Sequence, residues 1–174
     1  MELTTPLIES EVDKLKAGDT VSISGTIYTA RDAAHGRMFA SLEKGEAPPF
    51  DYENNIVFYA GPCPTPPGKP MGAIGPTTAG RMDAYSPDLI ASGLRYMLAK
   101  GDRSEAVRAA IKAHKGAYFV AVGGAAALLA KRITHSEIVA YDDLGTEAIR
   151  KLTVENFPVI VAIDNTGRSI FDDE

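Results

Sequence analysis

The chain is poor in cysteine and histidine and has no tryptophan. Among its 174 residues, Cys63 is the one cysteine, so no disulfide forms within the chain and the reducing cytoplasm is the expected compartment. One thiolate also cannot hold an iron–sulfur cluster, which needs several. The histidines His35, His114 and His135 lie far apart in sequence, without the spacing typical of zinc or iron sites. We therefore expect no metal ion bound by this chain.

Positive charge and long apolar runs are scarce as well. The chain has 18 Lys and Arg against 23 Asp and Glu, a net charge of −5, and no basic tract, which argues against a nucleic-acid partner. No apolar run reaches the ~18 residues that a membrane-spanning helix needs. The segment 1–6 is too polar for a signal peptide and lacks a basic leader. We expect neither a membrane anchor nor a nucleic-acid ligand.

The hydrophobic fraction of 45% is sufficient for a real core, and the length indicates one domain over residues 1–174. Apolar and polar residues alternate over 21–29, which predicts a strand, and Gly25 is expected to mark a bulge in it. Apolar residues recur every four positions over 31–43, which predicts a helix ended by Gly45.

The other predicted elements are short. Further strands are predicted at 56–60, 96–99, 118–122, 136–141, 152–155 and 159–164. Further helices are predicted at 86–92 with Ser86 as cap, at 104–114, and after Gly123-Gly124, and 7–16 is predicted as a short helix or a turn. Strand-rich ends around a βαβαβ middle predict an α/β fold, a layered domain with a mixed, partly parallel sheet.

The segment Gly75–Asp83 is the most informative stretch of the chain. It places Thr77, Thr78, Gly80 and Arg81 within a few residues directly after an apolar run. Glycine lets the backbone approach a ligand, while hydroxyls and a guanidinium suit a carboxylate or phosphate. A strand-to-helix turn capped by a threonine explains the same residues. From the spacing alone, both interpretations stay open.

Other polar residues also follow predicted strands. Ligands of parallel sheets bind at the carboxyl ends of the strands, and Arg31 and Lys100 both lie just after one. Each has a plainer interpretation as a solvated turn residue. His35 fits a partly buried, hydrogen-bonded residue better than a catalyst. Gly123-Gly124 is weak evidence for an anion cradle, and close packing against the sheet is the expected role.

Taken in order, these motifs resemble the β subunit of two-subunit, class I fumarate hydratases, and the chain is also similar to the β subunit of L-tartrate dehydratase. The likeness covers nearly the whole chain. It is carried by residues 25–35, 75–83, 99–101, 122–126 and 155–158. The resemblance implies a swivelling β/β/α domain and the reversible hydration of fumarate to (S)-malate.

The resemblance also implies roles for individual residues. Arg31, Arg81 and Lys100 would bind the dicarboxylate, and Thr77 would be the base that exchanges the C3 proton, helped by a carboxylate of the partner chain. Positive charge around Thr77 is chemically coherent with this role, because it stabilises an alkoxide and an enolate-like intermediate. The residues expected to support this site are His35, Thr78, Gly80 and Gly101.

The cofactor implied by the resemblance is a [4Fe-4S] cluster held by a separate α subunit, with none bound by this chain. The partners implied are that α subunit, in a heterotetramer of two α and two β chains, and a small dicarboxylate. The segments 79–80 and 101–104 resemble those of fumarases, and this resemblance favours fumarate as the substrate. An L-tartrate or other hydroxy-diacid dehydratase stays an alternative, as does a non-catalytic anion-binding module.

Overall fold

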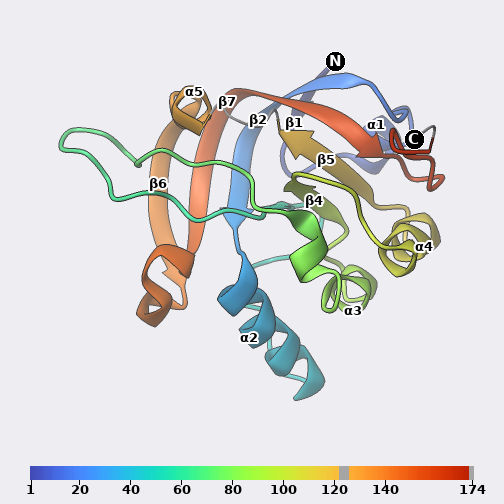
Figure 1. Ribbon diagram of the computed structural model, residues 1–174, viewed down its shortest axis with the longest axis horizontal. Helices are drawn as coiled ribbons and strands as arrows, with labels where there is room; N and C mark the ends of the chain where they lie inside the picture. The colour runs from blue at the N-terminus through green and yellow to red at the C-terminus, as the bar shows by residue number, and fades with distance from the viewer. Residues whose placement is uncertain (122–125, 173–174) are drawn as a thin grey trace.

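The computed structural model describes residues 1–121 and 126–172, and its strands form one seven-stranded mixed sheet (Figure 1). The strand order is β1-β2-β3-β4-β5-β7-β6. The strands are β1 (Glu2–Thr4), β2 (Thr20–Thr29), β3 (Ile56–Phe58), β4 (Tyr96–Ala99), β5 (Ala117–Ala121), β6 (Ile133–Ala140) and β7 (Ile149–Ile163). The predicted α/β class with a mixed, partly parallel sheet is confirmed.

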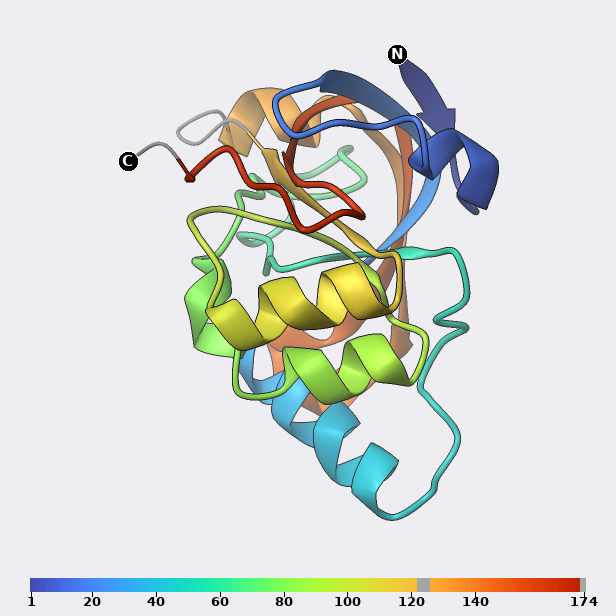
Figure 2. The same ribbon diagram turned by 90° about the vertical axis from the view of Figure 1, so that its right-hand side faces the viewer.

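Short helices connect these strands. They are α1 (Glu9–Val12), α2 (Asp32–Glu43), α3 (Ser86–Ala91), α4 (Glu105–Ala113), α5 (Ala126–Ala130) and two 3₁₀ helices, η1 (Ala79–Met82) and η2 (Asp142–Glu147). Helices α2, α3 and α4 lie side by side on one face of the sheet (Figure 2). None of the helices within the described ranges is long and apolar enough to cross a membrane.

The sheet closes on itself through β7. Strands β2, β3, β4 and β5 pair in parallel, each with the next, whereas β7 runs antiparallel to β5, β6 and β2. Because β7 contacts both β5 and β2, the strands β2, β3, β4, β5 and β7 complete a ring. The carboxyl ends of β2, β3 and β4 consequently lie at one edge of the molecule, where parallel strands usually place their ligands.

The prediction of two separate strands at 152–155 and 159–164 is wrong, because β7 is continuous over both. Pro158 lies within β7 and faces Ser22 of β2, while Asn156 adopts a positive φ of 50°. The register between β2 and β7 shifts at this point, so the bulge expected at Gly25 is confirmed, with the extra residue on β7. The Asn156 amide donates to the Ser24 hydroxyl (3.0 Å), and this bond carries the pairing across the shift.

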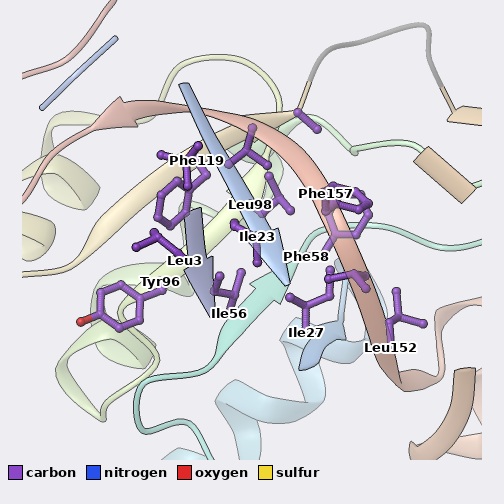
Figure 3. Close-up of a cluster of buried hydrophobic side chains, with 14 of the residues drawn as sticks. Leu3, Ile23, Ile27, Ile56, Phe58, Tyr96, Leu98, Phe119, Leu152 and Phe157 are labelled. Carbon is purple, nitrogen blue, oxygen red and sulfur yellow. The ribbon is translucent and has the colours of Figure 1, made fainter. Parts of the chain in front are cut away.

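Two hydrophobic clusters cover the two faces of the sheet. Side chains alternate along a strand, so Ile56 and Phe58 of β3 enter one cluster, whereas Val57 enters the other. The first cluster is shown in Figure 3 and packs against α1 and α5. The second lies under α2, α3 and α4, and it forms the floor beneath the segments that carry the predicted site.

Most helix boundaries were predictable, with informative exceptions. Ser104 caps α4 by accepting from the Val107 amide (3.3 Å), and Gly45 ends α2 with a positive φ of 69°. The predicted cap at Ser86 is wrong, because its hydroxyl donates to the Met82 carbonyl (2.9 Å) and Tyr85 holds the cap position. The segment 7–16, predicted as a short helix or a turn, contains the helix α1, and the pair Gly123-Gly124 lies outside the described residues.

The bulge yields a stability prediction. Gly25 and Gly18 both have positive φ, 109° and 98°. A Cβ at Gly25 would lie 2.5 Å from the Thr5 hydroxyl, whereas one at Gly18 would meet nothing within 4 Å in the part of the chain that the structure describes. Alanine costs backbone strain at both positions and adds overpacking at Gly25 alone. Gly25→Ala should therefore lower the free energy of unfolding by about 1–3 kcal/mol more than Gly18→Ala, as measured by urea denaturation. Equal losses would contradict the packing at the bulge.

Candidate functional site

The predicted site residues follow three neighbouring parallel strands. Arg31 comes just after β2, and the Ala30 amide beside it donates to the Phe58 carbonyl of β3 (3.0 Å). Thr77 joins the end of β3 through a bond from its amide to the Tyr59 carbonyl (2.7 Å). Lys100 directly follows β4. The structure thus places these three residues, from distant parts of the sequence, at the same edge of the sheet.

Backbone hydrogen bonds join the Thr77 turn to the segment after β4. The Lys100 amide donates to the Thr77 carbonyl (3.3 Å), and the Ala79 amide donates to the Lys100 carbonyl (2.9 Å). Thr77 is partly buried, whereas Thr78 and Lys100 are exposed. Within residues 1–121 and 126–172, the Thr77 hydroxyl and the Lys100 ammonium have no hydrogen bond or ion pair. Both groups are therefore available to a ligand.

Asp32 connects the two predicted arginines. Arg81, on η1, donates from Nε to Asp32 Oδ1 (2.9 Å) and from Nη2 to Asp32 Oδ2, a two-point contact. Arg31 Nε lies 3.8 Å from Asp32 Oδ2. The hydrogen bonds from Arg81 hold the pKa of Asp32 below its ordinary value, against the opposing effect of burial. Asp32 is thus an ionised carboxylate shared by two cations.

Glu147 is a second acid at this edge, and the sequence did not single it out. Its Oε1 accepts from the Ala33 amide in the first turn of α2 (2.9 Å) and lies 3.4 Å from Arg31 Nε. The Arg31 side chain also lies close to the backbone of Gly61, since a Cβ on Gly61 would be 3.3 Å from it. Arg31 therefore lies in a confined position between β2 and η2, and no sequence pattern predicts this contact across more than a hundred residues.

His35 lies behind Arg31 rather than facing solvent. Its ring is fully buried, its Nδ1 is 3.0 Å from the Arg31 carbonyl, and it packs edge-on against Tyr59 with 4.6 Å between centroids. Burial lowers the pKa of His35 to about 4, so the ring is neutral near pH 7. With Nδ1 as the donor to that carbonyl, Nε2 has no partner among the described residues. The geometry makes His35 a support for Arg31.

The predicted glycines differ in what they contribute. Gly101 has a positive φ of 83°, and its carbonyl accepts from the Tyr118 hydroxyl (2.7 Å), so it shapes the turn after Lys100. Gly80 is exposed, and a Cβ there would meet no described residue within 4 Å. The structure gives Gly101 a conformational reason for being glycine and gives Gly80 none.

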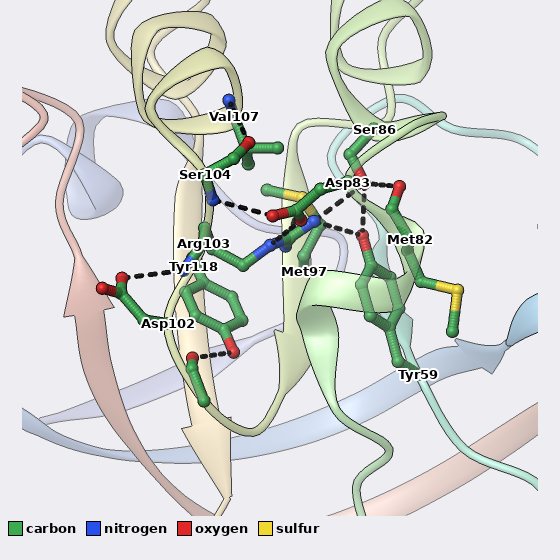
Figure 4. A network of polar contacts seen from close by, with 11 residues as sticks. Tyr59, Met82, Asp83, Ser86, Met97, Asp102, Arg103, Ser104, Val107 and Tyr118 are labelled. Carbon is green, nitrogen blue, oxygen red and sulfur yellow. Dashed lines mark hydrogen bonds and ion pairs between the residues drawn. The ribbon is translucent and has the colours of Figure 1, made fainter.

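The burial of Arg103 is the feature that the sequence analysis most clearly failed to predict. The segment 100–104 has the composition of a solvated turn, yet the Arg103 side chain is 0% exposed. Its Nε donates to Asp83 Oδ1 (2.8 Å) and its Nη2 donates to the Ser86 hydroxyl (2.8 Å), as Figure 4 shows. No periodicity marks this contact, because its partners lie on another segment. Two signals were available: Asp83 ends the Gly75–Asp83 motif, and Arg103 lies in the segment 101–104 that resembles fumarases.

The chain does not offer a set of ligands for an iron–sulfur cluster. Its single cysteine, Cys63, is exposed on the loop after β3. In the part of the chain that the structure describes, no group of three or more His, Cys, Asp or Glu side chains is arranged to hold a metal ion. The edge described above presents arginine, lysine and threonine, which bind anions.

Comparisons with known proteins agree on one family. Residues 1–174 match the family described as "Fumarase C-terminus". The chain is 42% identical over 98% of its length to "Fumarate hydratase class I, anaerobic" of Escherichia coli (strain K12), of which it covers 32%. It is 37% identical over 99% of its length to "Putative L(+)-tartrate dehydratase subunit beta" of Methanocaldococcus jannaschii, of which it covers 92%. The chain thus spans about a third of that fumarate hydratase and nearly all of that subunit.

The buried histidine predicts a pH dependence of stability. The pKa of His35 falls from 6.5 to about 4 on folding, so between these values the unfolded chain binds the proton more tightly. The stabilisation of the folded chain that comes from neutral His35 is complete above pH 6.5 and is lost as the pH falls toward 4. It amounts to roughly 3 kcal/mol of unfolding free energy. Urea unfolding at several pH values should show this slope.

The matched variants are His35→Asn and His114→Asn, since His114 is exposed. His35→Asn keeps an N–H donor for the Arg31 carbonyl and removes the titrating group, so it should flatten the pH dependence in this range. His114→Asn should leave the wild-type slope. An unchanged slope in His35→Asn would assign the acid sensitivity to other groups.

Proposed function

Because the chain belongs to the fumarase C-terminus family, we propose that it supplies the substrate-binding cations and the base of a cytoplasmic hydro-lyase that interconverts fumarate and (S)-malate. The observation that carries the proposal is the convergence of Arg31, Thr77 and Lys100 at the carboxyl ends of three neighbouring strands, with Arg81 joined to them through Asp32. The fumarate hydratases among the relatives support this choice of substrate.

The charges of this edge suit a small dianion. Arg31, Arg81 and Lys100 carry three positive charges, which Asp32 and Glu147 balance in part. Asp32 accepts hydrogen bonds from Nε and Nη2 of Arg81. Within the described residues, Arg81 Nη1 therefore stays available for a substrate carboxylate. A dicarboxylate would then bind to Arg81 and Arg31, with Lys100 as a third contact.

Thr77 is proposed to move the proton at C3. In the dehydration direction its oxygen, as an alkoxide, takes the proton from C3, the C2–O bond breaks with its electron pair on the leaving oxygen, and the double bond forms between C2 and C3. Hydration reverses these steps. An alkoxide is a costly species in water, and neighbouring cations stabilise it together with the negative charge that develops on the substrate. Lys100, whose backbone adjoins that of Thr77, supplies such a cation.

The proposed enzyme requires a second component. The [4Fe-4S] cluster expected for this reaction does not fit a chain with a single exposed cysteine. We propose that a separate α subunit holds the cluster and that this chain acts as its swivelling β/β/α partner. One observation supports a two-component arrangement: the chain is 37% identical to a relative that is named as a subunit.

One relative supports an alternative substrate. It is named as an L(+)-tartrate dehydratase subunit. Tartrate is also a hydroxy-diacid, and the same three cations would bind its carboxylates. Turnover of (S)-malate and L-tartrate by the reconstituted pair distinguishes these substrates.

Removal of the Thr77 hydroxyl tests the proposed base. Thr77→Ala, mixed with the α subunit under anaerobic conditions, should lower kcat by about 10²–10⁴-fold, because a base that acts in the transition state is lost. Thr77→Ser should retain most of the activity. The control is Thr134→Ala, an exposed threonine of β6 far along the chain from this site. Fumarate absorbance reports the rate.

Three outcomes would contradict the proposal. A wild-type kcat in Thr77→Ala would exclude Thr77 as the base, whereas a wild-type pair that turns over no dicarboxylate would favour the non-catalytic anion-binding module. Full activity of this chain without any α subunit would contradict the dependence on a second component.

A further inference from the structure

Arg103 has no role in the chemistry proposed above, yet its side chain is the centre of a buried polar network (Figure 4). We propose that Arg103 is a positioning residue, which holds the segment with Lys100 in register with the turn that carries Thr77 and Arg81. Its effect on catalysis rests on the proposed function. Its effect on the register is a property of this chain by itself.

The direct connection between the two segments is slight. It consists of the bond from the Lys100 amide to the Thr77 carbonyl (3.3 Å) and the bond from the Ala79 amide to the Lys100 carbonyl (2.9 Å). Lys100 takes part in both bonds and is exposed, so water competes for its backbone groups, whereas Ala79 is buried. A second attachment is needed to keep the Lys100 ammonium at a fixed distance from the Thr77 hydroxyl.

Arg103 and Asp83 provide that attachment. Arg103 lies three residues after Lys100, and Asp83 directly follows η1. Arg103 Nε donates to Asp83 Oδ1 (2.8 Å), while Asp83 Oδ2 accepts from the Ser104 amide (2.7 Å). One carboxylate therefore holds a side chain and a backbone group of the segment after β4. The two segments are tied at both ends, by backbone bonds at Lys100 and by Asp83 at Arg103.

Aromatic rings fix the direction of the guanidinium. The carbon Cζ of Arg103 lies 5.2 Å from the ring centroid of Tyr59 and 5.0 Å from that of Tyr118, within the range of cation–π attraction. Nη2 also reaches the Tyr59 hydroxyl (3.3 Å), and the Tyr118 hydroxyl donates to the Gly101 carbonyl (2.7 Å). Tyr59 is the residue whose carbonyl holds the Thr77 amide. The network therefore connects through Tyr59 to the backbone of Thr77, and through Tyr118 to the turn after Lys100.

Stability alone does not explain a charge at this place. The side chain of Arg103 is 0% exposed and that of Asp83 is 15% exposed, so both lose hydration on folding. Well-packed apolar residues in place of a buried ion pair often leave stability unchanged or raise it. By contrast, a planar guanidinium fixes several partners at once and in defined directions. The pair is thus suited to setting the geometry of two segments.

The test compares Arg103→Lys with Arg108→Lys. Arg108 pairs with Asp172 (2.8 Å) and donates to the Gly167 carbonyl, so it makes similar contacts away from the site.

On the chain alone, we expect Arg103→Lys to keep a cooperative thermal transition, while amide hydrogen exchange at Ala79 and Lys100 becomes at least ~10-fold faster than in wild type. With the α subunit, its kcat/KM should fall by about 10–100-fold, with a raised KM and a lowered kcat, because both Lys100 and Thr77 are displaced. Arg108→Lys should match wild type in both measurements.

A second variant covers the case in which Arg103→Lys does not fold. The double variant Arg103→Met with Asp83→Asn removes both charges, fills the slot between the two tyrosines and keeps an acceptor for the Ser104 amide. It should unfold near the wild-type temperature and show the same faster exchange and lower kcat/KM.

The outcomes separate the two proposals. Wild-type exchange at Ala79 and Lys100 in a folded Arg103 variant would overturn the positioning role, as would a wild-type kcat together with a wild-type KM. If the wild-type pair turns over no dicarboxylate, the proposed function fails, and the exchange rates of the chain alone still decide whether Arg103 sets the register.

Discussion

The parallel pairing of β2, β3 and β4 is the constraint on which the site depends. Parallel strands bring their carboxyl ends to one edge, so the residues that follow these strands meet there although they are far apart in the chain. The strand β7 secures this arrangement, because its antiparallel pairing with β2 and β5 closes the ring. Arg31, Thr77 and Lys100 are thereby brought to one edge by backbone hydrogen bonds within the sheet and next to it.

Two acids, Asp32 and Glu147, balance part of the positive charge of the site. Asp32 contacts both Arg31 and Arg81, and Glu147 contacts Arg31, so the two acids offset the positive charges of the arginines. These acids come from the first turn of α2 and from η2, so the charge balance also fixes both segments at the edge of the sheet. A substrate dianion would meet cations that are already oriented, and orientation before binding reduces the entropy that binding costs.

Local patterns predicted much of the fold and part of the site. The alternation over β2 and the four-residue spacing over α2 depend on neighbours in sequence, and both elements formed as expected. The strand-end rule also predicted that Arg31 and Lys100 approach the Thr77 turn. The continuity of β7 was missed, because Pro158 signals a break and pairing with β2 carries the strand past it.

The contacts of Arg103 and Glu147 were missed for a related reason. Each depends on a partner from a different segment, and neither side chain belongs to a periodic apolar pattern. Ser86 has the sequence context of a helix cap, yet its hydroxyl binds the Met82 carbonyl and Arg103. Burial of a polar side chain is decided by tertiary packing, which a single sequence does not encode in its spacing.

The proposed role of this edge is to bind the two carboxylates of the substrate. A crystal structure of the chain with its cluster-bearing α subunit and (S)-malate is the decisive measurement. We expect substrate carboxylate oxygens within hydrogen-bond distance of Arg31, Arg81 and Lys100, and the C3 carbon next to the Thr77 hydroxyl. A diacid held by the α subunit alone, with these four side chains out of contact, would contradict it.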